Sequence, residues 1–84
     1  MENYAFTKKQ SMSGNTEMRT MFGRNMAVVL TKANGFYYIN LYNNNPRNPG
    51  RCSLGWDEFL KLTNMKEALE QLFPQFEVHA SCFY

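Results

Sequence analysis

With 84 residues, a mass of 9.9 kDa and 44% hydrophobic side chains, the chain can form one small globular domain and no more. It has no apolar run near the roughly 18 residues of a membrane span, no N-terminal apolar run like that of a signal peptide, and too few cysteines for the disulfide framework of small secreted folds. The net charge of +2 neither requires nor excludes a polyanionic partner, so we expect a soluble intracellular protein without a membrane partner, nuclear or cytoplasmic according to its source.

The chain begins with a segment that predicts little regular structure. Residues 1–16 are polar, and the Ser, Gly and Asn content of SMSGNT is typical of a flexible arm. We expect order to begin at residue 17, with short strands over 17–22 and 26–31 separated by Gly23. The second run, MAVVLT, is rich in the β-branched side chains that favour strands.

The pair Asn34-Gly35 predicts a type I′ hairpin turn, because both residues tolerate positive φ. Residues 36–43 would form the returning strand. Alternation places three side chains on the expected core face: Tyr37, Ile39 and Leu41. It places four on the opposite face: Phe36, Tyr38, Asn40 and Tyr42. This second face is either buried by another layer, such as a partner subunit or the C-terminal arm, or it contacts a ligand.

The second half of the chain predicts a loop, a strand and an amphipathic helix. Residues 43–50 contain two prolines and several Asn residues, which suits a loop, and 51–54 can form a short strand. Apolar side chains then recur at helical spacing: Phe59, Leu62, Met65, Leu69 and Leu72. We favour one helix that ends before Pro74, and a break into two helices near Asn64 is the alternative. Residues 76–84 would form a C-terminal arm or an extra strand.

Side chains that could carry catalysis or hold a metal are scarce. His79 is the only histidine, and the sequence offers no base and orienting group for a Cys-His pair. Cys52, His79 and Cys82 would supply three ligands at no recognised spacing, whereas structural zinc takes four. We therefore expect no enzyme activity, no metal site and no cofactor.

Charge is distributed unevenly along the chain. Residues 1–52 carry seven basic and two acidic side chains, a net charge of +5, whereas residues 53–84 carry two basic and five acidic ones, a net charge of −3. Either the acidic side chains simply form the solvated surface of the helix, or the basic, strand-rich half meets a polyanion.

Three stretches within residues 19–73 carry a resemblance to a known family. The first is Gly23-Arg24 followed by Gly35 in the turn, the second is the strand YYINL over 37–41, and the third is CSL over 52–54, which leads through Asp57-Glu58 to Phe59 and Leu62. Together they resemble the DNA-binding domain of the positive cofactor four family of transcriptional coactivators.

The resemblance implies an α+β fold over residues 17–75. Its small antiparallel sheet of about four strands would be strongly curved and followed by one amphipathic helix. The helix would form a homodimer through Phe59, Leu62, Met65, Leu69 and Leu72, and the sheet would bind single-stranded nucleic acid. By its spacing alone, the same apolar stripe could instead pack into the core of its own chain. The family's basic contact after the first glycine falls on Arg24, which keeps the charge. Ala33 stands where the family has an aromatic residue, and Asn34 and Tyr42 stand where it has basic ones. The family's basic loop is reduced to Arg47 and Arg51.

Stacking and phosphate contacts could still come from other side chains. The candidate nucleic-acid-binding residues are Arg24, Lys32, Asn34, Phe36, Tyr38, Tyr42, Arg47 and Arg51, which Lys8, Lys9 and Arg19 of the N-terminal segment could join. The expected function is sequence-tolerant binding of single-stranded DNA or RNA in transcription, replication or repair. The alternative is a protein-interaction module that keeps the fold and binds a protein partner through its aromatic residues.

Overall fold

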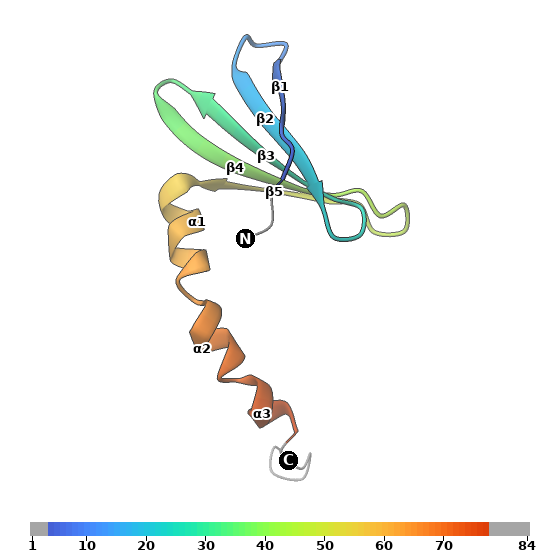
Figure 1. Ribbon diagram of the computed structural model, residues 1–84, viewed down its shortest axis with the longest axis vertical. Helices are drawn as coiled ribbons and strands as arrows, with labels where there is room; N and C mark the ends of the chain where they lie inside the picture. Colours follow the sequence, from blue (N-terminus) through green and yellow to red (C-terminus); the bar gives the residue numbers. More distant parts are fainter. Residues whose placement is uncertain (1–3, 78–84) are drawn as a thin grey trace.

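The computed structural model describes residues 4–77, which form an antiparallel sheet followed by short helices (Figure 1). The five strands lie side by side in chain order: β1 (Thr7–Gln10), β2 (Thr16–Phe22), β3 (Met26–Ala33), β4 (Phe36–Asn43) and β5 (Gly50–Gly55). Three helices follow: α1 (Trp56–Thr63), α2 (Lys66–Glu70) and α3 (Phe73–Phe76). The α+β class is confirmed, but the sheet has five strands rather than about four, and it is not strongly curled.

Strand β1 lies within the segment expected to be a flexible arm. It pairs with β2 from Thr7 opposite Arg19 to Gln10 opposite Thr16. A turn over residues 11–15 joins the two strands, and the Gly14 N–H donates to the Ser11 carbonyl at 2.9 Å. The polar sequence TKKQ carries no strand periodicity of its own, so its strand conformation depends on the pairing with β2.

The β3–β4 turn has the predicted conformation. Asn34 and Gly35 have φ of 53° and 80°, as a type I′ turn requires, and Ala33 pairs directly with Phe36 across it. The two-residue turn therefore sets the register of the hairpin, with Leu30 opposite Ile39 and Thr31 opposite Tyr38.

The register divides the side chains of the sheet between two faces, because directly paired residues of antiparallel strands point to the same side. The aliphatic face carries Met18, Val28, Leu30, Tyr37, Ile39, Leu41 and Leu54. The aromatic face carries Lys9, Arg19, Ala27, Val29, Phe36, Tyr38, Asn40, Tyr42 and Arg51. The predicted alternation along β4 is thus confirmed.

The core is small and does not coincide with the expected core face. Among residues 4–77 the buried hydrophobic side chains are Ala27, Val29 and Ile39, with exposed fractions of 0%, 3% and 5%. Ile39 lies on the aliphatic face between Leu30 and Leu54, but the other two lie on the aromatic face. Of the expected core residues, Leu41 is half-buried and Tyr37 is 48% exposed, because only part of the aliphatic face is covered by α1.

The predicted single helix is instead three segments. The break near Asn64, which was the alternative, is present: Met65 N–H donates to the Leu62 carbonyl, three residues back, and Leu72 N–H does the same to Leu69. Such tightened turns interrupt the regular α-helical pattern. The helical path also continues past Pro74, which occupies the first turn of α3, where no N–H is needed for an intrahelical bond.

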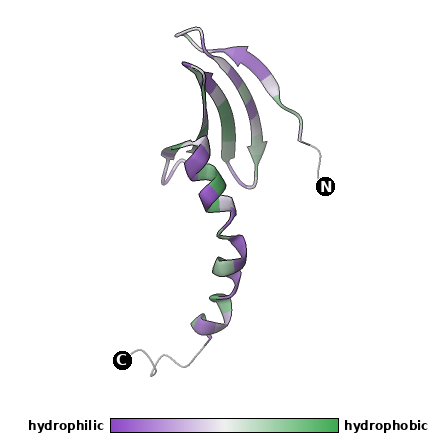
Figure 2. Cartoon of the chain, turned by 90° about the vertical axis from the view of Figure 1, so that its left-hand side faces the viewer, coloured by the Kyte–Doolittle hydropathy of each residue, from purple (hydrophilic) through white to green (hydrophobic). Residues whose placement is uncertain are grey.

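The helices extend away from the sheet. Helix α1 contacts β4 and β5, and α2 and α3 then lead away from the strands (Figure 1). Figure 2 shows hydrophobic residues along the central strands and both hydrophobic and hydrophilic residues on every helix. The radius of gyration is 17.0 Å, whereas a compact domain of this length would have about 12 Å. Within residues 4–77, no helix is long and apolar enough to cross a membrane.

The positive φ of Gly35 predicts a difference between two glycine substitutions. A Cβ added at Gly35 or at Gly50 would meet no atom within 4 Å, but only Gly35 has positive φ. We expect Gly35→Ala to lower the free energy of unfolding by about 1–2 kcal/mol, and Gly50→Ala to leave it unchanged or slightly raised. Urea unfolding followed by circular dichroism measures both, and equal losses would contradict the explanation.

Candidate nucleic-acid interface

Strand β4 places three of the predicted residues on the aromatic face. Phe36 is 66% exposed, Tyr38 is 38% exposed and Tyr42 is half-buried. The predicted Arg51 joins them, because it lies directly opposite Tyr42 on the neighbouring strand β5. Four of the eight predicted residues therefore share one face of the sheet.

Two arginines flank the Tyr42 ring on this face. The Arg51 guanidinium carbon is 5.7 Å from the ring centroid, and that of Arg19 is 5.9 Å from it. Arg19 comes from β2 and reaches Tyr42 across β3. On β3, Val29 lies directly opposite Arg19 and Ala27 directly opposite Tyr42, so the contact runs diagonally past these two side chains, the smaller of which is a methyl group. Cation–π contacts of this kind hold a guanidinium near a ring while leaving its N–H donors available.

A row of hydrogen-bonded polar side chains lies between Tyr38 and Tyr42. The Asn40 amide donates from Nδ2 to Thr31 Oγ1 at 3.0 Å, and its Oδ1 accepts a hydrogen bond from the Ser53 hydroxyl. The three residues come from β3, β4 and β5, so the row crosses the central strands. It holds the Asn40 side chain in one orientation, with polar surface between the two rings.

The other predicted residues lie elsewhere. Lys32 is on the aliphatic face opposite Tyr37, with its ammonium nitrogen 5.6 Å from the centroid of that ring. Asn34 lies in the β3–β4 turn, next to Phe36. Arg24 lies in the loop between β2 and β3, and Arg47 lies in the loop between β4 and β5 (Figure 1). A hydrogen bond joins the two loops, because the Asn44 N–H donates to the Asn25 carbonyl at 2.7 Å.

Arg19 is the residue that the candidate set left out. It had been considered only as an addition from the N-terminal segment, but β2 places it on the aromatic face opposite Val29, next to the tyrosine that it contacts. Alternation along 17–22 was the available signal, since Glu17, Arg19 and Met21 share one face.

The predicted dimer residues form an exposed apolar stripe. Phe59 is half-buried and stacks on Trp56, with 5.4 Å between the ring centroids. The other four lie further along the helices and are 43–50% exposed: Leu62, Met65, Leu69 and Leu72. Helices α1, α2 and α3 contain no buried residue, so no layer formed by residues 4–77 buries the stripe.

The described residues hold no group of three or more His, Cys, Asp or Glu side chains that could bind a metal ion. Cys52 is a free, exposed thiol on β5. His79 and Cys82 lie outside the described residues, as does most of the expected C-terminal arm over 76–84.

A scan against protein-family models, a search of curated proteins and a search of solved structures each found no match.

The contact between Arg19 and Tyr42 predicts that β3 must stay small at residue 27. Ala27→Leu would place a larger side chain beneath the Tyr42 ring, and we expect it to lower the free energy of unfolding by about 1–3 kcal/mol. Val28→Leu on the opposite, half-buried face is the matched control and should cost less than about 1.5 kcal/mol. Urea unfolding measures both variants, and a larger loss in Val28→Leu would contradict this assignment.

Proposed function

We propose that the protein binds single-stranded DNA or RNA with little sequence preference, as a dimer and without catalysis, in the manner of the coactivator domains that its sequence resembles. The observation that carries the proposal is the aromatic face, where exposed rings stand beside arginines. Phe36 and Tyr38 present ring surface, and the Arg19–Tyr42–Arg51 cluster presents two cations within 6 Å of one ring centroid.

This combination suits single strands because their bases are free to stack. Each base stacked on an aromatic side chain contributes roughly 1–3 kcal/mol, whichever base it is. Arginines beside the rings would contact the phosphates, and a guanidinium matches phosphate geometry with paired N–H donors. The row of Thr31, Asn40 and Ser53 could donate to sugar or base atoms between the stacked positions.

Dimerisation is the second part of the proposal. The apolar side chains of the stripe are largely exposed, and burying them would stabilise a domain of this length, which has only a small hydrophobic core. A second copy could cover it with an identical stripe, as a two-fold dimer does. The dimer would also double the number of cations that a polyanion meets.

The alternative is the protein-interaction module. Phe36 favours it, because this ring is 66% exposed at the end of the β3–β4 hairpin with Asn34 rather than a cation beside it. A protein partner could cover it as readily as a base. Absence of oligonucleotide binding at low salt would favour this alternative.

Neighbouring tyrosines on opposite faces test the proposed stacking. We expect Tyr38→Ala to weaken binding of a labelled single-stranded oligonucleotide by roughly 1–3 kcal/mol, the contribution of one stacked base. Tyr37→Ala removes the same ring from the aliphatic face and should change binding much less. Fluorescence anisotropy measures the affinities, and circular dichroism checks that both variants fold. Equal effects of the two substitutions, or binding that does not weaken as salt rises, would contradict the proposal.

A charge placed in the stripe tests the dimer. We expect Leu69→Glu to yield monomers, because a carboxylate in an apolar interface loses its hydration. Gln71→Glu adds the same charge two residues away, where Glu67 and Glu70 already line the surface, and should leave the dimer intact. Light scattering gives the mass of each variant. A monomeric wild-type chain, or a Leu69→Glu dimer, would refute this interface.

A further inference from the structure

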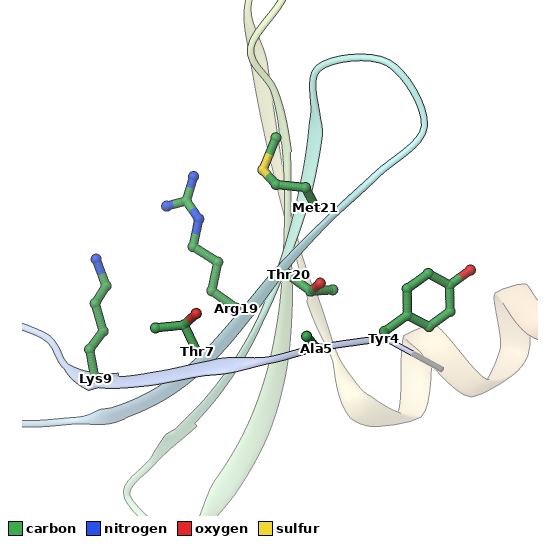
Figure 3. A pocket seen from close by; sticks show the side chains of 7 residues that line it. All are labelled: Tyr4, Ala5, Thr7, Lys9, Arg19, Thr20 and Met21. Carbon is green, nitrogen blue, oxygen red and sulfur yellow. The ribbon is translucent and has the colours of Figure 1, made fainter. Parts of the chain in front are cut away.

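An open pocket lies over β1 and β2, at the edge of the sheet (Figure 3). Lys9, Thr7, Arg19 and Met21 line it and point to the same side in the close-up view. Register gives the same result: Thr7 lies directly opposite Arg19, and Lys9 lies one pair further along, opposite Glu17. These four lining residues therefore belong to the aromatic face, and the other three are Tyr4 and Ala5, which precede β1, and Thr20, which the register places on the aliphatic face.

Arg19 connects this pocket to the rings. Its side chain lines the pocket and its guanidinium carbon lies 5.9 Å from the Tyr42 ring centroid, with Arg51 beyond that ring. Lys9, Arg19, Tyr42 and Arg51 thus form a row that runs from β1 to β5. With about 4.8 Å between neighbouring strands, the row crosses roughly 19 Å of sheet.

The charges in the pocket favour an anion. Lys9 is exposed, and among residues 4–77 the one ion pair is Lys66–Glu70, so neither Lys9 nor Arg19 forms an ion pair with a carboxylate. Glu17 is the single carboxylate on the aromatic face of the five strands, and it lies opposite Lys9. Two cations against one carboxylate leave the pocket net positive, and the Thr7 hydroxyl adds a hydrogen-bond donor.

We infer that this pocket binds a backbone phosphate of the same single-stranded nucleic acid, so that β1 extends the binding track beyond the rings. Lys9 supplies a point charge, Thr7 a hydroxyl donor, and Arg19 a guanidinium that both lines the pocket and flanks Tyr42. The inference rests on the proposed function, and it assigns a role in binding to the strand that was expected to be a flexible arm.

Two adjacent lysines provide the test. Lys9 is on the aromatic face, whereas Lys8, its neighbour on the same exposed strand, is on the aliphatic face opposite Met18. Binding of a labelled oligothymidylate is measured by fluorescence anisotropy at several salt concentrations for the full-length wild type, Lys9→Ala, Lys8→Ala and Lys9→Arg. We expect Lys9→Ala to make the slope of log K against log salt shallower by about 0.7, the value of one phosphate contact on a single strand. Lys8→Ala and Lys9→Arg should keep the wild-type slope.

An abasic oligonucleotide separates phosphate contacts from base contacts. The change in slope caused by Lys9→Ala should persist on a sugar-phosphate chain without bases, whereas the loss caused by Tyr38→Ala should disappear there. Disappearance of the Lys9→Ala effect on this chain would overturn the phosphate assignment, whereas persistence of the Tyr38→Ala loss would contradict base stacking on Tyr38.

The remaining outcomes keep the two proposals distinct. If Lys8→Ala made the slope of log K against log salt as shallow as Lys9→Ala does, the effect would be one of general charge, and the assignment of a phosphate to the pocket would be overturned. If Lys9→Ala kept the wild-type slope while Arg51→Ala weakened binding, the binding surface would not extend to β1. The inference about the pocket would then be wrong, and the proposed function would stand. Failure of the wild type to bind at low salt would overturn both.

Discussion

The two-residue turn at Asn34-Gly35 is the constraint from which the arrangement of the sheet follows. Because its residues have positive φ and place Ala33 opposite Phe36, every later pair of the β3–β4 hairpin is set. A shift of one residue would move Tyr38 and Tyr42 to the side of α1 and bring Ile39 to the opposite face. Strands β2 and β5 pair with the two sides of this hairpin, so the faces of the whole sheet inherit its register.

Small side chains on β3 determine how the aromatic face is packed. Ala27 and Val29 are buried there, and the longer side chains of Tyr42 and Arg19 lie directly opposite them on the neighbouring strands. The face is consequently built from rings and guanidinium groups resting on a thin aliphatic layer. Packing and charge are thus supplied by the same residues, so the cluster contributes to the stability of the sheet as well as to its electrostatic potential.

Local signals predicted the central hairpin well. The β-branched run, the turn and the alternation along β4 each depend on neighbouring residues alone. Lys32 was grouped with the rings although a two-residue turn already places it opposite Tyr37, so register would have corrected that grouping. Strand β1 and the contact between Arg19 and Tyr42 were beyond such reasoning, because one depends on a partner strand and the other crosses an intervening strand above a methyl group. The helix break near Asn64 was one of the two predicted alternatives, whereas the second break, before α3, depends on backbone geometry that the apolar spacing does not encode.

The placement of Lys8 and Lys9 on opposite faces of β1 has a consequence for aggregation. Strand β1 is an edge strand of the sheet, and an edge strand exposes unpaired N–H and C=O groups to other chains. Here the edge is only four residues long, and its two central side chains put an ammonium group on each side of the sheet. A second sheet approaching edge to edge would bring like charges together on both faces. The same short strand that widens the basic surface thereby guards the sheet against growth into fibres.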